Sequence, residues 1–160
     1  MKRVLAFALT ILAVPALGQE PGGVFTGTLN GNPFTCEIWP MQSDFGSFGD
    51  TLTVSIMTNR CEGDESLGQI ALSFEQTGET IGSVEIRLRG EGDIPDLYGG
   101  TETGATLEML SASEESVFLS LSGNVSAQVG SSDDHGNTID LSAARSLEIS
   151  FSGVIEGLVQ

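Results

Sequence analysis

His135 is the residue of this chain most able to do chemistry, and it is the only histidine. It lies in the polar segment Ser-Ser-Asp-Asp-His-Gly-Asn at 131–137. Neighbouring carboxylates favour the charged imidazole, so a general base or a metal ligand is one interpretation. A serine nucleophile would need His135 and an acid to converge on it, and the chain holds no nucleophile-elbow pattern. Because Asp, Gly and Asn are typical turn residues, we interpret the segment as a solvated turn.

The same segment suggests a structural Ca²⁺ site. Asp133, Asp134 and Asp140 are its candidate ligands, because Ca²⁺ prefers carboxylate and backbone oxygens. The EF-hand spacing is missing, and acidic loops at 61–65 and 93–96 offer the same oxygens. Acidic turns are common without any ion. No other cofactor is predicted.

Cys36 and Cys61 are the only cysteines, and we predict that they form a disulfide. An even pair of cysteines indicates such a bond in an oxidising compartment. Zinc binding would need further ligands, which a single histidine does not supply.

Trp39 and Tyr98 are the candidate ligand-binding residues, because each is the only residue of its type. Exposed aromatic rings can serve as platforms for a sugar or a peptide. The alternative is that both rings plug the ends of a core, with their polar tips in water.

Strands must position all of these residues, since apolar side chains alternate along nearly the whole chain. The clearest pair is a hairpin of 24–29 and 33–39, because Asn30-Gly31 between them is the preferred pair for a type I′ turn. A two-residue turn places Phe25 opposite Cys36 and sorts apolar from polar faces.

The other predicted strands show the same alternation. They cover 51–58, 68–76, 82–89, 105–109, 117–129, 139–141 and 147–155. Residues 43–50 are predicted as a loop, 77–79 as a three-residue turn and 90–100 as a longer connection. A strand of thirteen residues is long, so we expect a bend or bulge near Gly123.

This pattern predicts one all-β domain over 19–160. Eight or nine strands at these spacings indicate an antiparallel β-sandwich, with a closed β-barrel as the alternative. Residues 1–18 are predicted as a cleaved signal peptide: Lys2 and Arg3 precede an apolar run that ends at Pro15, and Ala16 and Gly18 are small. The apolar run is too short to span a bilayer. The predicted location is therefore the periplasm or the outside of the cell.

The charge of the chain limits its partners. There are 22 acidic and six basic residues, for a formal net charge of −16. A nucleic-acid binder needs cations to contact phosphates, and an anionic membrane would repel this chain. Nucleic acid and a stable membrane anchor are therefore excluded, whereas another exported protein or a small ligand remains. High net charge also simply keeps a protein soluble.

Three functions follow, in order of preference. The first is a non-catalytic exported β-domain that binds a partner or packs into an envelope assembly, because no pattern of a catalytic site stands out in the sequence. The second is a barrel that carries a small apolar ligand, which requires an interior cavity. The third is a hydrolase that uses loop carboxylates, with His135 as a further group.

Overall fold

The computed structural model describes residues 22–115 and 117–157, and the predicted signal peptide at 1–18 lies outside the described residues. The described chain forms strands and two short 3-10 helices, η1 (Pro40–Gln42) and η2 (Thr101–Thr103). The strands are β1 (Gly22–Leu29), β2 (Asn32–Glu37), β3 (Asp44–Phe48), β4 (Thr51–Met57), β5 (Leu67–Thr77), β6 (Thr80–Gly90), β7 (Leu97–Gly100), β8 (Thr106–Glu115), β9 (Phe118–Ser131) and β10 (Asp140–Glu156).

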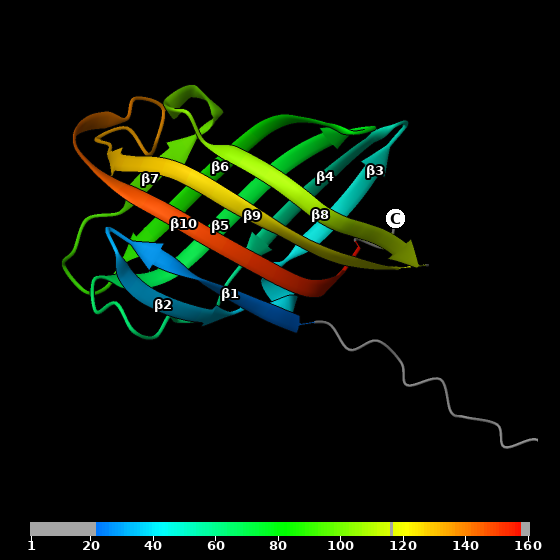
Figure 1. Ribbon diagram of the computed structural model, residues 1–160, viewed down its shortest axis with the longest axis horizontal. Helices are drawn as coiled ribbons and strands as arrows, with labels where there is room; N and C mark the ends of the chain where they lie inside the picture. The colour runs from blue at the N-terminus through cyan, green and yellow to red at the C-terminus, as the bar shows by residue number, and fades with distance from the viewer. Residues whose placement is uncertain (1–21, 116, 158–160) are drawn as a thin grey trace, which may run out of the picture.

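The strands form one antiparallel sheet that folds over on itself into two layers. Its order is β2-β1-β10-β9-β7-β6-β5-β4-β3, and β8 also pairs with β9. Figure 1 shows β1, β2, β8, β9 and β10 in front of β3 to β7. The strand order runs from β2 to β3 without closing. The sandwich prediction is therefore confirmed, and the closed-barrel alternative is wrong.

The first hairpin has the predicted register. Phe25 pairs with Cys36, and Gly27 pairs with Phe34. Asn30 and Gly31 both have positive φ, at 52° and 84°, as a type I′ turn requires. Local turn chemistry was therefore enough to predict this pairing.

Three predictions about connections are wrong. The connection predicted at 90–100 contains the strand β7, which pairs with β6. Residues 43–50 are not a loop, since β3 pairs with β4 there. The link between β5 and β6 is a two-residue turn, Gly78-Glu79, with Thr77 paired to Thr80. A register shift between Phe74 and Gln76 then realigns the strands, so that Phe74 faces Val84. The inward-facing residues of β5 and β6 therefore pair because of this bulge, and not because the turn has three residues.

The bulge expected near Gly123 lies on the partner strand instead. The pairing of β9 with β10 runs unbroken past Gly123. On β8 the register shifts between Met109 and Ser111. Leu110 is the extra residue, and its side chain is 60% exposed.

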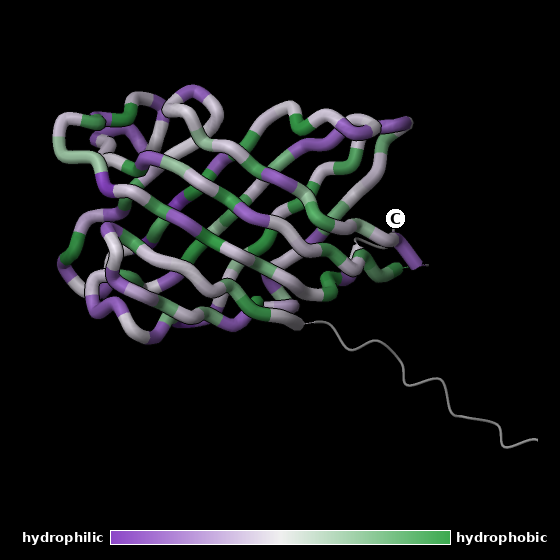
Figure 2. Tube along the Cα trace, viewed as in Figure 1, coloured by the Kyte–Doolittle hydropathy of each residue, from purple (hydrophilic) through white to green (hydrophobic). Residues whose placement is uncertain are grey.

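The interior between the layers is a packed core. Figure 2 shows the hydrophobic and hydrophilic residues alternating along the strands. Phe25 of β1 and its cross-strand partner Phe151 of β10 are both buried in it, with their ring centroids 5.4 Å apart. The largest fully buried side chains come from both layers: Phe25, Phe74, Leu29, Ile56, Ile70, Leu72, Leu88, Leu119, Leu147, Ile155, Val54 and Val125.

The predicted disulfide Cys36–Cys61 is present. It joins β2, one end of the strand order, to the segment that follows β4. Isolated bridges between Thr35 and Glu62 and between Ile38 and Thr58 flank it. This edge of the sandwich is therefore held by a covalent bond and two local pairings rather than by a continuous ladder.

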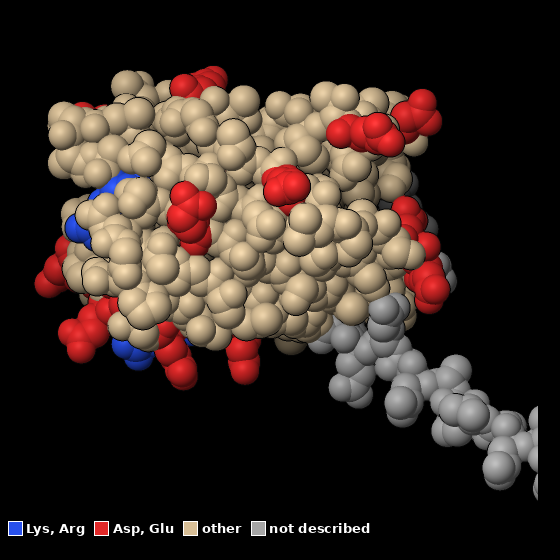
Figure 3. All heavy atoms as spheres, viewed as in Figure 1, with Lys and Arg blue, Asp and Glu red and all other residues tan. Residues whose placement is uncertain are grey.

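Basic side chains gather at one end of the molecule, which is the left end in Figure 3. Arg60 forms an ion pair with Glu91, and Arg87 forms one with Asp96. Arg89 lies close by on β6. Acidic groups are spread more widely over the visible face (Figure 3). In the described part of the chain, no helix is long and apolar enough to cross a membrane.

Candidate functional site

A groove of about 470 Å³ lies on the outer face of the back layer. Its floor is formed by β5 and β6, its rim by β7 and η2, and its other wall by residues 135–139 of the β9–β10 loop. Along these strands the inward side chains belong to the core, so the outward ones face the groove. They are small on the floor, where Ala71, Ser73 and Ser83 leave room above the sheet.

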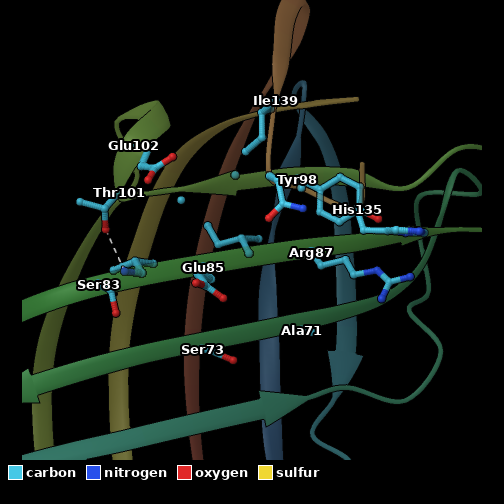
Figure 4. A pocket seen from close by; sticks show the side chains of 16 residues that line it. Ala71, Ser73, Ser83, Glu85, Arg87, Tyr98, Thr101, Glu102, His135 and Ile139 are labelled. Carbon is cyan, nitrogen blue, oxygen red and sulfur yellow. Dashed lines mark hydrogen bonds between the residues drawn. The ribbon is translucent and has the colours of Figure 1, made fainter. Parts of the chain in front are cut away.

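The groove has two chemically different ends. Figure 4 shows Glu85 and Glu102 at one end, Arg87 and His135 at the other, and Tyr98 on the side of Arg87 and His135. Arg87 and Glu85 alternate with buried residues on β6, whose neighbours Ile86 and Val84 point into the core. Strand periodicity alone therefore sets both charges on the groove side.

Tyr98 is the one predicted ligand-binding residue that lines the groove. It pairs with Arg87 across the strands, and the guanidinium lies 5.8 Å from its ring centroid. Gly136 packs on the ring so closely that a Cβ there would lie 2.8 Å from it. The tyrosine is 9% exposed and lies outside the main core cluster. It thus anchors the loop that forms one wall of the groove.

Trp39 is not brought to this site. It lies between β2 and η1, is half-buried, and its backbone N–H donates to the Met57 carbonyl. Its own carbonyl accepts a hydrogen bond from the Ser43 hydroxyl. The two unique aromatic residues therefore serve different parts of the fold.

His135 lies in a turn, as the residue types of its segment indicated. Its φ is +60°, and Gly136 follows at +98°. The Ser132 hydroxyl accepts a hydrogen bond from the Gly136 N–H and donates one to Asp134. The imidazole is exposed, and it is held in the groove wall by its backbone.

Asp134 and Asp140 organise the backbone of this loop. The Asp134 carboxylate accepts hydrogen bonds from the Ser132 hydroxyl and the Thr138 N–H, and these lower its pKa. Asp140 accepts a hydrogen bond from the Ser142 N–H, which lowers its pKa as well. Both carboxylates thus already have partners within the loop.

The calcium site stays a prediction. Within residues 22–115 and 117–157, no group of three or more His, Cys, Asp or Glu side chains could hold a metal ion. Asp133 is exposed beside Asp134. If these aspartates bind Ca²⁺, millimolar Ca²⁺ should raise the melting temperature, because a ligand that binds only the folded state stabilises it.

Sequence reasoning missed most of the groove. Glu85, Glu102 and Arg87 are ordinary surface residues in the sequence, and only the pairing of β6 with β7 brings Glu85 opposite Gly100, next to η2. Period-2 alternation does place Glu85 and Arg87 on one face, which is the one signal available beforehand. The chain matches no known family model, no curated protein and no solved structure.

Proposed function

We propose that this chain is an exported, non-catalytic binding domain that takes a small ligand in the groove on β5, β6 and β7. The observation that carries the proposal is the groove itself. Its volume of about 470 Å³ falls in the range of small-molecule sites, roughly 300–1,000 Å³. It combines charged groups and a floor of small side chains with Tyr98, whose side chain is largely buried in the groove wall.

The core supports this choice over an apolar-ligand carrier. Such a carrier needs an interior cavity, whereas side chains from both layers of the sheet fill the space between these layers. The outer face is the surface that remains for binding.

The arrangement of the groove favours binding over hydrolysis. A pair of groups acting as acid and base must both reach the same substrate atoms. His135 lies toward the opposite end of the groove from Glu85 and Glu102 (Figure 4). These residues are better placed to contact different parts of one ligand.

Export is part of the proposal. The disulfide is the kind of bond that persists in an oxidising compartment. The basic and apolar residues at the start of the chain are typical of a leader. Periplasm and extracellular space offer the same redox conditions.

A fragment screen by NMR tests the binding function. We expect small molecules to shift the backbone resonances of Tyr98, Gly99 and Gly136 in the ¹⁵N-labelled mature chain. Ser73→Trp should fill the groove and abolish these shifts, while Thr53→Trp, on an exposed part of the same face, should leave them. Shifts that survive Ser73→Trp, or a broad library without a hit in the groove, would refute the proposal.

A further inference from the structure

The free hydrogen-bonding groups of the groove are unevenly distributed. The Arg87 Nε and Nη2 both donate to the Asp96 carboxylate, at 2.9 and 2.6 Å. The side chains of Glu85 and Glu102 are exposed and make no hydrogen bond or ion pair with the described residues. The positive charge of the groove is thus already balanced, and its two lining carboxylates are not.

We infer, on the basis of the proposed function, that the ligand of this groove is an organic cation, a small amine with an apolar stem. Ionised carboxylates only accept hydrogen bonds, and an ammonium only donates them. An anionic ligand would meet Glu85 and Glu102 without a free guanidinium to offset them. The acidic end therefore selects for positive charge.

The rest of the groove suits the stem of such a molecule. Ile139 and Tyr98 line it, and Ala71 lies on its floor. The ammonium would lie on the groove side of β6 and η2, near Glu85 and Glu102. There Thr101 is held by the hydrogen bond from the Val84 N–H to its hydroxyl, at 2.8 Å. This hydrogen bond fixes η2, and with it Glu102, against the strand that carries Glu85.

The field of the whole protein acts in the same direction. With 22 acidic and six basic residues, the molecule attracts cations and raises their concentration near its surface. Arg87 and Arg89 follow Glu85 on β6 and so lie farther from η2 along that strand. The cation is therefore drawn to the end of the groove where its carboxylate partners are.

Three probes of one shape test the inference: butylamine, 1-butanol and butyrate, titrated into the ¹⁵N-labelled chain at low salt. We expect butylamine to shift groove resonances most strongly and butyrate not at all. Glu85→Gln and Glu102→Gln should each weaken butylamine binding about two- to fivefold, the range for one exposed charge pair. Glu75→Gln removes the same charge from an exposed site on β5 outside the groove, so it should leave binding nearly unchanged.

The outcomes separate this inference from the proposed function. If 1-butanol binds in the groove as tightly as butylamine, the cation inference is wrong and the binding function stands. If Glu75→Gln weakens butylamine as much as Glu85→Gln does, the effect is general attraction and the inference is again overturned. Absence of any shift with butylamine also overturns it, while the fragment screen still decides the binding function.

Discussion

At the residue scale, a few buried polar side chains hold loops in place through hydrogen bonds. Asp64 is one of them, since it is 9% exposed and accepts hydrogen bonds from the Ser66 N–H and hydroxyl. Burial opposes its ionisation, but Ser66, a hydrogen bond from Asn32 and the charge of Arg145 outweigh it and lower the pKa of Asp64. The carboxylate thereby orders the loop between β4 and β5, where the Ser66 hydroxyl also accepts a hydrogen bond from Arg145 of β10.

Replacing Asp64 by alanine should reduce the free energy of unfolding at neutral pH by about 1–3 kcal/mol, because Ser66 loses a buried acceptor. Urea unfolding measures this loss. Asp50→Ala, in the exposed turn between β3 and β4, is the control and should have little effect. Equal losses in both variants would contradict the role given to Asp64.

The stability of the wild-type chain should also depend on this carboxylate in acid. A group whose pKa is lower in the folded state stabilises that state above its unfolded pKa. This stabilisation is lost as the pH falls from the ordinary aspartate value of 3.8 through the lower folded value. Asp64→Ala should therefore lose less stability between pH 5 and pH 2 than the wild type does, as urea titrations at several pH values would reveal.

A glycine in the first hairpin is required by close packing rather than by backbone conformation. A Cβ on Gly27 would clash with the Glu148 carbonyl and lie 2.9 Å from the Phe34 ring. Gly27→Ala should therefore lower stability by about 1–3 kcal/mol, the usual cost of overpacking. Gly46→Ala on β3 meets nothing within 4 Å and should be nearly neutral, and a pair of melting curves compares the two.

At the scale of elements, the sequence predicted strands wherever burial on one face makes apolar residues alternate. The register of the first hairpin was predicted correctly, since Asn30-Gly31 specifies its turn, although β1 begins at Gly22 and β2 ends at Glu37. The strand β3 was missed because only Phe45 of its residues is buried. Its sequence therefore shows no alternation of apolar and polar residues. The strand β10 joins two segments that were predicted as separate strands, 139–141 and 147–155. They form one strand because they both pair with β9, and this pairing cannot be predicted from local sequence.

The groove, too, could be predicted only in part. Its strand residues could be assigned to an outward face from alternation, but η2 and the 135–139 loop reach it only through tertiary pairing. Tyr98 was singled out as unique, and nothing near it in sequence indicated that Gly136 would cover its ring. Contacts between distant loops are where sequence periodicity stops being informative.

The strand β8 is an edge that needs protection from pairing with other molecules. It pairs only with β9 among the described strands, and it carries a bulge and the exposed Glu108 and Glu114. Replacing both glutamates by valine should accelerate aggregation several-fold, as light scattering would record. Glu148→Val on the central strand β10 adds a similar apolar side chain away from an edge, so it should aggregate no faster than wild type.

At the scale of the whole molecule, the two layers are linked covalently at one edge. Cys36 and Cys61 are 25 residues apart in sequence, and the bond fixes β2 to the loop between β4 and β5. Constraining a loop of that length in the unfolded chain stabilises the fold by about 3.5 kcal/mol in the chain-entropy model.

Cys36→Ser combined with Cys61→Ser should lower the free energy of unfolding by about this amount, about 3.5 kcal/mol. Urea unfolding of the oxidised wild type, the reduced wild type and the double variant measures it. Reduced wild type and double variant should behave alike. A double variant as stable as the oxidised protein would show that the bond adds nothing.

The first and last strands of the domain are partners, with Gly22–Leu29 of β1 paired to β10 residues 147–154. A chain of this topology cannot complete its front layer until its final residues have been synthesised. The reason is that β1 pairs with β10, which lies more than a hundred residues later in the sequence. Pairings of such sequence separation form slowly. The newly made chain is therefore expected to complete its front layer later than a protein built from neighbouring hairpins. In a chain without β10, β1 would pair only with β2, and β9 would lose its longest pairing.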